Sequence, residues 1–231
     1  MLIIGHRGAP NIAQENTLDS FDKAFQNNVD GIELDVQLTK DNKLAVFHDF
    51  HTFSLNGRKD LIKDISYNSL QRLSTKFKIP TLNNVLEFLP PNKEIHVEIK
   101  SNKINNSIIV DKVLKCISKK NLNTRSIISS FNPFVLSAIK NKAPLQKIGL
   151  LWTKSIDSHW FITHYSYYKV KPYSFHANIK YFNKKIEHWV KRKGLKLYFY
   201  TVNNKIDLIK AKQYNADGIF TDYPNINLRS K

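Results

Sequence analysis

Cysteine is almost absent from this sequence of 231 residues, which contains only Cys116. An internal disulfide and a cysteine-based zinc cluster are therefore excluded. Cys116 lies in the apolar part of a predicted helix, where a small buried side chain is the simplest interpretation. No stretch approaches the roughly 20 apolar residues that span a bilayer, and the first residues lack the pattern of a signal peptide. We therefore expect a soluble, cytoplasmic protein.

Acidic residues are few: 19 Asp and Glu stand against 36 Lys and Arg, giving a net charge of +17. Such a charge can favour binding to nucleic acid, to an anionic membrane surface or to an anionic substrate. The lysines are scattered, and their densest cluster, within residues 184–193, falls on the polar side of a predicted amphipathic helix. With no recognised nucleic-acid motif, a basic nucleic-acid-binding protein is only a distant alternative. Weak association with an anionic membrane surface is compatible with the charge.

Hydrophobic residues make up 42% of the chain, which argues against a disordered protein. The length fits one domain, residues 1–231, of the size of a single α/β barrel. Apolar, β-branched runs alternate with helix-like segments throughout. The predicted barrel strands are Leu2–Gly5, Gly31–Val36, Ile95–Ile99, Ser126–Ser129, Lys147–Leu151, Ser174–Ala177, Leu195–Thr201 and Gly218–Thr221. The predicted helices are Leu18–Asn28, Leu82–Phe88, Asn105–Lys119, Pro133–Lys140, Phe182–Lys193 and Lys205–Tyr214.

Near-continuous apolar strands separated by helices indicate a parallel sheet that is covered on both faces. The pattern fits a closed (β/α)8 TIM barrel better than an open doubly wound sheet, because no G-x-G-x-x-G follows a predicted strand. A short extra strand is predicted at Leu44–His48, with a small insertion after it. The aromatic-rich segment Trp152–Lys171 is compatible with a helix and with a loop over the barrel mouth.

Carboxylates interrupt the apolar pattern where strands approach their carboxyl ends, which is where a barrel carries its working residues. Glu33 and Asp35 are two residues apart and so share one face of a strand, and Glu98 lies near the end of the next barrel strand. Three such groups would repel one another if buried unpaired. A hard divalent cation, Mg²⁺ or Ca²⁺, would resolve this repulsion because it takes oxygen ligands. The alternative is a salt bridge with Lys100 or Arg7 and no metal.

Two histidines, His6 and His48, also follow predicted strands. Histidine titrates near neutral pH and can exchange protons with an attacking and a leaving oxygen. Arg7 offers a planar fork and Lys100 a point charge, and both suit phosphate oxygens. Proton-transfer groups, cations and a metal at one barrel mouth favour phosphoryl transfer over carbonyl chemistry.

Several segments follow one another between Gly5 and Pro224: GHRGAPNIAQENTLDSF, GIELDVQLTKDNKLAVFHD, IPTLNNVLEFLP, HVEIKS, TVN and DGIFTDYP. In that order they resemble the motifs of bacterial glycerophosphodiester phosphodiesterases, in a short form without the large insertion. The resemblance implies metal-dependent hydrolysis of glycerophosphodiesters, such as deacylated phospholipids, to sn-glycerol 3-phosphate and an alcohol.

Matched position by position, the resemblance also implies roles for individual residues. His6 and His48 would be the general acid and base, in an order left open. Glu33, Asp35 and Glu98 would hold one divalent metal ion, Mg²⁺ or Ca²⁺. The substrate and its phosphate would contact Arg7, Lys100, Glu15, Asn16 and Asn203.

The identity of the leaving alcohol stays open at this stage. Many members of the family have Trp where this chain has Tyr200. The segment Asp49–Ile79 lacks the large insertion of glycerol-selective members, and its part Phe50–Leu55 departs from the usual family sequence. The aromatic stretch His159–Tyr168 either packs as a barrel helix or lines an apolar entrance. A lysophospholipase D acting on monoacyl lysophospholipids is therefore the alternative to a glycerophosphodiesterase.

Overall fold

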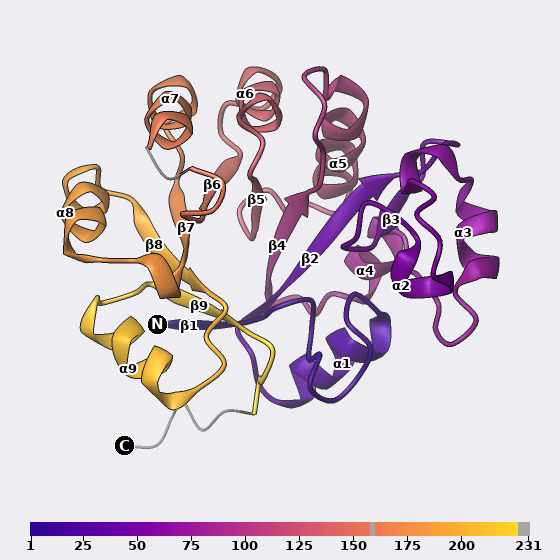
Figure 1. Ribbon diagram of the computed structural model, residues 1–231, viewed down its shortest axis with the longest axis horizontal. Coiled ribbons are helices and arrows are strands. Elements are labelled where there is room, and N and C mark those ends of the chain that lie inside the picture. Colours follow the sequence, from indigo (N-terminus) through magenta and orange to yellow (C-terminus); the bar gives the residue numbers. More distant parts are fainter. Residues whose placement is uncertain (158–159, 226–231) are drawn as a thin grey trace.

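Eight parallel strands close into a barrel in the computed structural model, which describes residues 1–157 and 160–225 (Figure 1). Hydrogen bonds run through the order β1-β9-β8-β7-β6-β5-β4-β2, and β1 pairs with β2 to complete the circle. An open doubly wound sheet has no such closure, so the TIM-barrel prediction is confirmed. The strands are β1 Leu2–Gly5, β2 Gly31–Leu38, β3 Leu44–Val46, β4 Glu94–Ile99, β5 Ser126–Ser130, β6 Lys147–Trp152, β7 Ser174–Asn178, β8 Lys196–Tyr200 and β9 Gly218–Thr221.

Helices surround the barrel (Figure 1). They are α1 Leu18–Gln26, α2 Phe53–Asn56, α3 Tyr67–Leu73, α4 Leu82–Phe88, α5 Ser107–Lys119, α6 Pro133–Lys142, α7 Phe161–Val170, α8 Lys184–Arg192 and α9 Lys205–Gln213, with short 3₁₀ turns η1 Ile62–Asp64 and η2 Ile179–Tyr181. All the α-helices except α2 and α3 bury apolar side chains in the main core around the sheet. In the part of the chain that the structure describes, none of these helices has the length and apolarity needed to cross a membrane.

Side-chain caps set the helix boundaries that apolar spacing alone predicted less well. The prediction began a helix at Phe182, but α8 begins two residues later because the Asn183 side chain accepts hydrogen bonds from the backbone of Lys185 and Ile186. Asn204 caps α9 in the same way, through the backbone N–H of Asp207. Each cap satisfies N–H groups that the first helical turn leaves without partners.

The predicted extra strand is present but shorter, because β3 ends at Val46. It pairs antiparallel with the end of β2, and the short helices α2 and α3 follow it at one side of the barrel (Figure 1). The sequence prediction missed both helices. A small separate core lies beside them and consists of Ala45, Phe47, Ile62, Leu70 and Ile79. Leu70 of α3 belongs to this core, and Leu55 of α2 packs against it.

The ambiguous segment Trp152–Lys171 contains the helix α7. Residues 158 and 159 of this segment lie outside the described residues. One side of α7 packs inward through Thr163, Ser166 and Val170. Its other side leaves Phe161 and Tyr165 exposed. The helix is therefore part of the barrel wall and also presents aromatic side chains to solvent.

The rings of histidine, tyrosine and phenylalanine side chains fill the interior of the barrel beneath its mouth. His96 and His176 are buried, and each packs within 5.4 Å, between ring centroids, of Tyr198 and Phe220. Gly149 opposite His176 leaves room for the imidazole, since a Cβ there would collide with it. Burial, with a further contribution from His96, lowers the pKa of His176 well below its usual value of 6.5.

This buried histidine predicts a loss of stability in mild acid. Below about pH 6.5 the unfolded chain binds a proton at His176 that the folded chain does not, so the free energy of unfolding falls as pH falls, by up to about 1.4 kcal/mol per pH unit. We expect His176→Gln to lose less stability than wild type between about pH 7.5 and pH 5.5 in urea titrations. His188→Gln, at an exposed site on α8, is the control and should behave as wild type. Equal losses in His176→Gln and wild type would contradict the assignment.

Candidate active site

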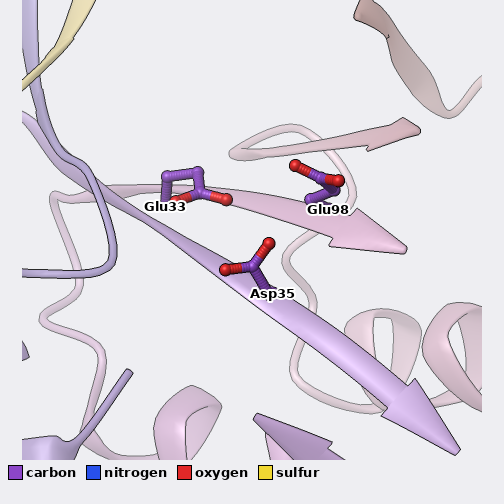
Figure 2. Close-up of side chains that lie close together, drawn as sticks. All are labelled: Glu33, Asp35 and Glu98. Carbon is purple, nitrogen blue, oxygen red and sulfur yellow. The ribbon is translucent and has the colours of Figure 1, made fainter. Parts of the chain in front are cut away.

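Three carboxylates meet where the middle of β2 lies beside the carboxyl end of β4 (Figure 2). The parallel register sets Asp35 directly beside Glu98, and Glu33 lies two residues earlier on the same face as Asp35. One oxygen from each of the three groups lies within 4.8 Å of the others. The polar exceptions to the apolar strand pattern are thus brought together as the sequence predicted.

Burial and mutual repulsion make this cluster unfavourable when all three groups are ionised. Burial, followed by the charges of Asp35 and Glu98, raises the pKa of Glu33 well above its usual range. Burial and the charge of Asp35 raise the pKa of Glu98 to about 7. Burial works the same way on Asp35, but Arg7 and Lys100 outweigh it and lower the pKa of that carboxyl.

Two cations partly offset the charge of the cluster. Arg7 Nε lies 3.2 Å from Asp35 Oδ2, and Lys100 Nζ lies 3.2 Å from Glu98 Oε1 and 3.8 Å from Asp35 Oδ1. Both salt bridges that the sequence offered as an alternative to metal are therefore present. The raised pKa values of Glu33 and Glu98 nevertheless show that they do not compensate the cluster fully. Three convergent carboxylates that lack full compensation are a donor set suited to Mg²⁺ or Ca²⁺.

The loop between β1 and α1 holds Arg7 in place. Arg7 and Gly8 both have positive φ, of 54° and 95°. Ser20 fixes the turn, since its hydroxyl donates to the Arg7 carbonyl at 3.0 Å and accepts from the Ala9 N–H at 2.8 Å. A Cβ on Gly8 would collide with Ser20, so glycine is required there on both grounds.

Glu15 and Asn16 support the site from the same loop. Arg7 Nη1 donates to both oxygens of Glu15, at 3.0 and 3.1 Å. The Asn16 amide donates to Asp35 Oδ2 at 3.0 Å and accepts from the Asp35 backbone N–H at 3.2 Å. In this structure the two residues orient a cation and a carboxylate of the cluster.

Each histidine has its Nδ1 beside an aspartate. His6 Nδ1 lies 2.6 Å from Asp222 Oδ1, and His48 Nδ1 lies 2.9 Å from Asp49 Oδ1. With Nδ1–H donated to the carboxylate, Nε2 is the nitrogen available to a reacting oxygen. His6 Nε2 lies 4.0 Å from Glu33 Oε2, at the edge of the carboxylate cluster.

Further contacts hold the two aspartates. Asn203 Nδ2 donates to Asp222 Oδ2 at 2.5 Å, and its Oδ1 accepts from the Asp222 backbone N–H at 2.9 Å. Ser54 Oγ donates to Asp49 Oδ2 at 2.8 Å. Asn203 was predicted to contact the substrate, whereas here it holds Asp222, and neither aspartate was given a role from the sequence. The only signals in the sequence for these roles were that Asp49 directly follows His48 and that Asp222 directly follows a predicted strand.

The electrostatic surroundings of His48 favour its neutral form. Burial lowers the pKa of His48, and the charges of Arg7 and Lys100 lower it further, against the opposing effect of Asp35. For Asp222, burial opposes ionisation, but the hydrogen bonds with His6 and Asn203 outweigh it and lower its pKa. A neutral imidazole at His48 is suited to accepting a proton.

These groups surround one pocket of about 260 Å³. The predicted residues His6, Arg7, Glu33, His48, Glu98 and Lys100 all line it. Its remaining wall is formed by Ser129, Phe131, Leu151, His176, Asn178, Tyr200, Thr201 and Phe220. The pocket thus combines two histidines, two cations and two carboxylates of the cluster.

Comparisons with known proteins agree on one family. Residues 6–226 match the profile of the Glycerophosphoryl diester phosphodiesterase family. A glycerophosphodiester phosphodiesterase from Caldanaerobacter subterraneus subsp. tengcongensis is 35% identical over 244 aligned positions, which cover 100% of this chain and 98% of that protein.

Solved structures share the fold. The glycerophosphodiester phosphodiesterase of Thermotoga maritima has 30% identity and a TM-score of 0.82, over 98% of this chain and 96% of that one. An Oleispira antarctica phosphodiesterase, solved with the product sn-glycerol-3-phosphate, has 24% identity and a TM-score of 0.85, over 97% and 94% of the two chains.

The carboxylate cluster predicts opposite effects of one substitution with and without metal. In chelator, Glu98→Gln should raise the unfolding temperature, because it removes a carboxyl whose ionisation near neutral pH opposes folding. With Mg²⁺ or Ca²⁺ at about 100 times its Kd, wild type should gain about 2.7 kcal/mol and Glu98→Gln much less. Glu87→Gln, at an exposed carboxylate, should match wild type in thermal denaturation under both conditions. An equal gain in Glu98→Gln would exclude Glu98 as a ligand.

Proposed function

The chain belongs to the glycerophosphoryl diester phosphodiesterase family, and from that premise we propose that it hydrolyses glycerophosphodiesters to sn-glycerol 3-phosphate and an alcohol. One observation carries the proposal: two aspartate-backed histidines line the same pocket as the cations and the carboxylate cluster. Phosphodiester hydrolysis needs charge neutralisation at phosphorus and proton transfer at two oxygens, and this pocket offers groups for both.

In the proposed reaction, Arg7 and Lys100 bind the non-bridging phosphate oxygens. One histidine Nε2 removes a proton from the attacking water molecule as the water oxygen bonds to phosphorus. The other donates a proton to the bridging oxygen as the P–O bond to the alcohol breaks, so that the net change is the addition of water. A divalent cation held by Glu33, Asp35 and Glu98 would stabilise the charge that develops on the phosphoryl oxygens.

Around this chemistry, neighbouring residues keep the reacting groups oriented. Asp222 and Asp49 fix the ring orientation and tautomer of the two histidines. Glu15 fixes the Arg7 guanidinium, and Asn16 fixes Asp35. Asn203 acts through Asp222, with which it makes two hydrogen bonds.

An assay of glycerophosphocholine and glycerophosphoethanolamine tests the function directly. We expect both to release sn-glycerol 3-phosphate in the presence of Mg²⁺ or Ca²⁺, with EDTA abolishing the release. His6→Ala should lower kcat by about 10²–10⁴-fold, the usual contribution of general acid–base catalysis. Activity that persists both in EDTA and in His6→Ala would contradict the proposed function.

The hydrogen bond between His6 and Asp222 predicts a positioning role. Asp222→Asn should lower kcat by roughly 10²-fold, since the imidazole loses the carboxylate that orients it. KM should change little, because Asp222 acts through His6 and not on the substrate. Asp111→Asn, on the outer helix α5, controls for loss of a carboxylate elsewhere. An increase in KM with unchanged kcat would instead indicate a substrate contact.

A further inference from the structure

Exposed apolar side chains gather next to the catalytic pocket. They come from three places: the loop after β4, the start of α6 and the region around α7. Ile104 and Phe161 are each 76% exposed, which is unusual for side chains of this size. Clustered exposed apolar surface on a soluble domain commonly marks a binding site. The main members are Ile104, Phe134, Ile156, Phe161 and Tyr165.

These side chains line a groove with a volume of about 740 Å³. That volume falls within the roughly 300–1,000 Å³ of small-molecule sites. The groove wall is mostly apolar, and Glu98 is the one acidic residue among the described residues that form it. Glu98 lies at the inner end of the groove, where it forms a salt bridge with Lys100.

The groove is continuous with the catalytic pocket. Glu98, Lys100 and Phe131 line both cavities. Lys100 Nζ also lies 5.8 Å from the centre of the Phe50 ring, another residue of the groove wall. A molecule whose phosphate contacts Lys100 can therefore extend an apolar tail over Phe50 and Phe131 toward Ile104.

We infer that this groove binds the single hydrocarbon chain of a monoacyl glycerophosphodiester whose phosphate occupies the catalytic pocket. The inference rests on the proposed function and adds a substrate class to it. The occupant has to be apolar along the groove and anionic at its inner end, because the wall is apolar and Lys100 stands at the junction. Water would cleave the P–O bond to the headgroup, so that the headgroup alcohol leaves with a proton and the monoacylglycerol keeps the phosphate.

A binding experiment tests the groove independently of catalysis. Hexyl-, octyl- and decylphosphocholine, each kept monomeric below its aggregation concentration, are titrated into the protein by calorimetry. We expect the Kd to fall by roughly fourfold for each methylene that the groove buries. In Ile104→Ser combined with Phe161→Ser this dependence on chain length should weaken. Ile206→Ser is the matched control, since Ile206 is 78% exposed on α9, away from the groove.

Hydrolysis supplies the second measurement. The ratio of kcat/KM for octanoyl-lysophosphatidylcholine to that for glycerophosphocholine should exceed one in wild type, and should fall in the Ile104/Phe161 double variant but not in Ile206→Ser. Binding that does not depend on chain length would overturn the inference, as would a dependence on chain length that appears only with lipid vesicles, which would indicate docking to a bilayer. Chain-dependent binding without hydrolysis of any glycerophosphodiester would leave the groove assignment standing and refute the proposed function.

Discussion

The crowding of three carboxylates on adjacent strands is the constraint on which the barrel mouth depends. Backbone pairing of β2 with β4 fixes Asp35 beside Glu98, so the repulsion is built into the sheet and cannot relax by a change of loop. The surrounding structure supplies positive charge to offset it. Arg7 arrives on the loop after β1 and Lys100 directly after β4. Both cations also suit a phosphate. The two residues that offset the negative charge of the cluster are therefore the residues that would bind the substrate.

Much of this arrangement could be predicted from the sequence, because it follows from the period of β-strands. Alternation places Glu33 and Asp35 on one face, and the barrel gathers the carboxyl ends of its strands at one mouth. The partner of His6 could not be predicted in this way. His6 and Asp222 are separated by 216 residues and meet only because β1 pairs with β9 when the barrel closes. The role of Asn203 depends on the same closure.

Other parts of the fold were hard to predict for a different reason. The short helices α2 and α3 are stabilised by a core drawn from β3 and the segment after it, and local spacing does not reveal such a core. In α7, two of the three buried residues are Thr163 and Ser166, and exposed positions carry aromatic side chains, so no apolar stripe marks the buried face. The structure resolves this, because Tyr167 packs against Trp189 while Phe161 and Tyr165 face outward.

The mouth therefore has two halves of different origin. The strands and the turns directly after them provide the carboxylates, the cations and the histidines, and their positions are fixed by the backbone hydrogen bonds of the sheet. The apolar half comes from the loop after β4, from α6 and from α7. The side chains of these segments that line the groove are exposed, so few contacts restrain them. Substitutions at Ile104 or Phe161 can alter the groove without displacing Glu98 or Lys100. If the groove binds the substrate as proposed, chemistry and substrate range are separable in this barrel, as is usual where loops vary on a fixed framework.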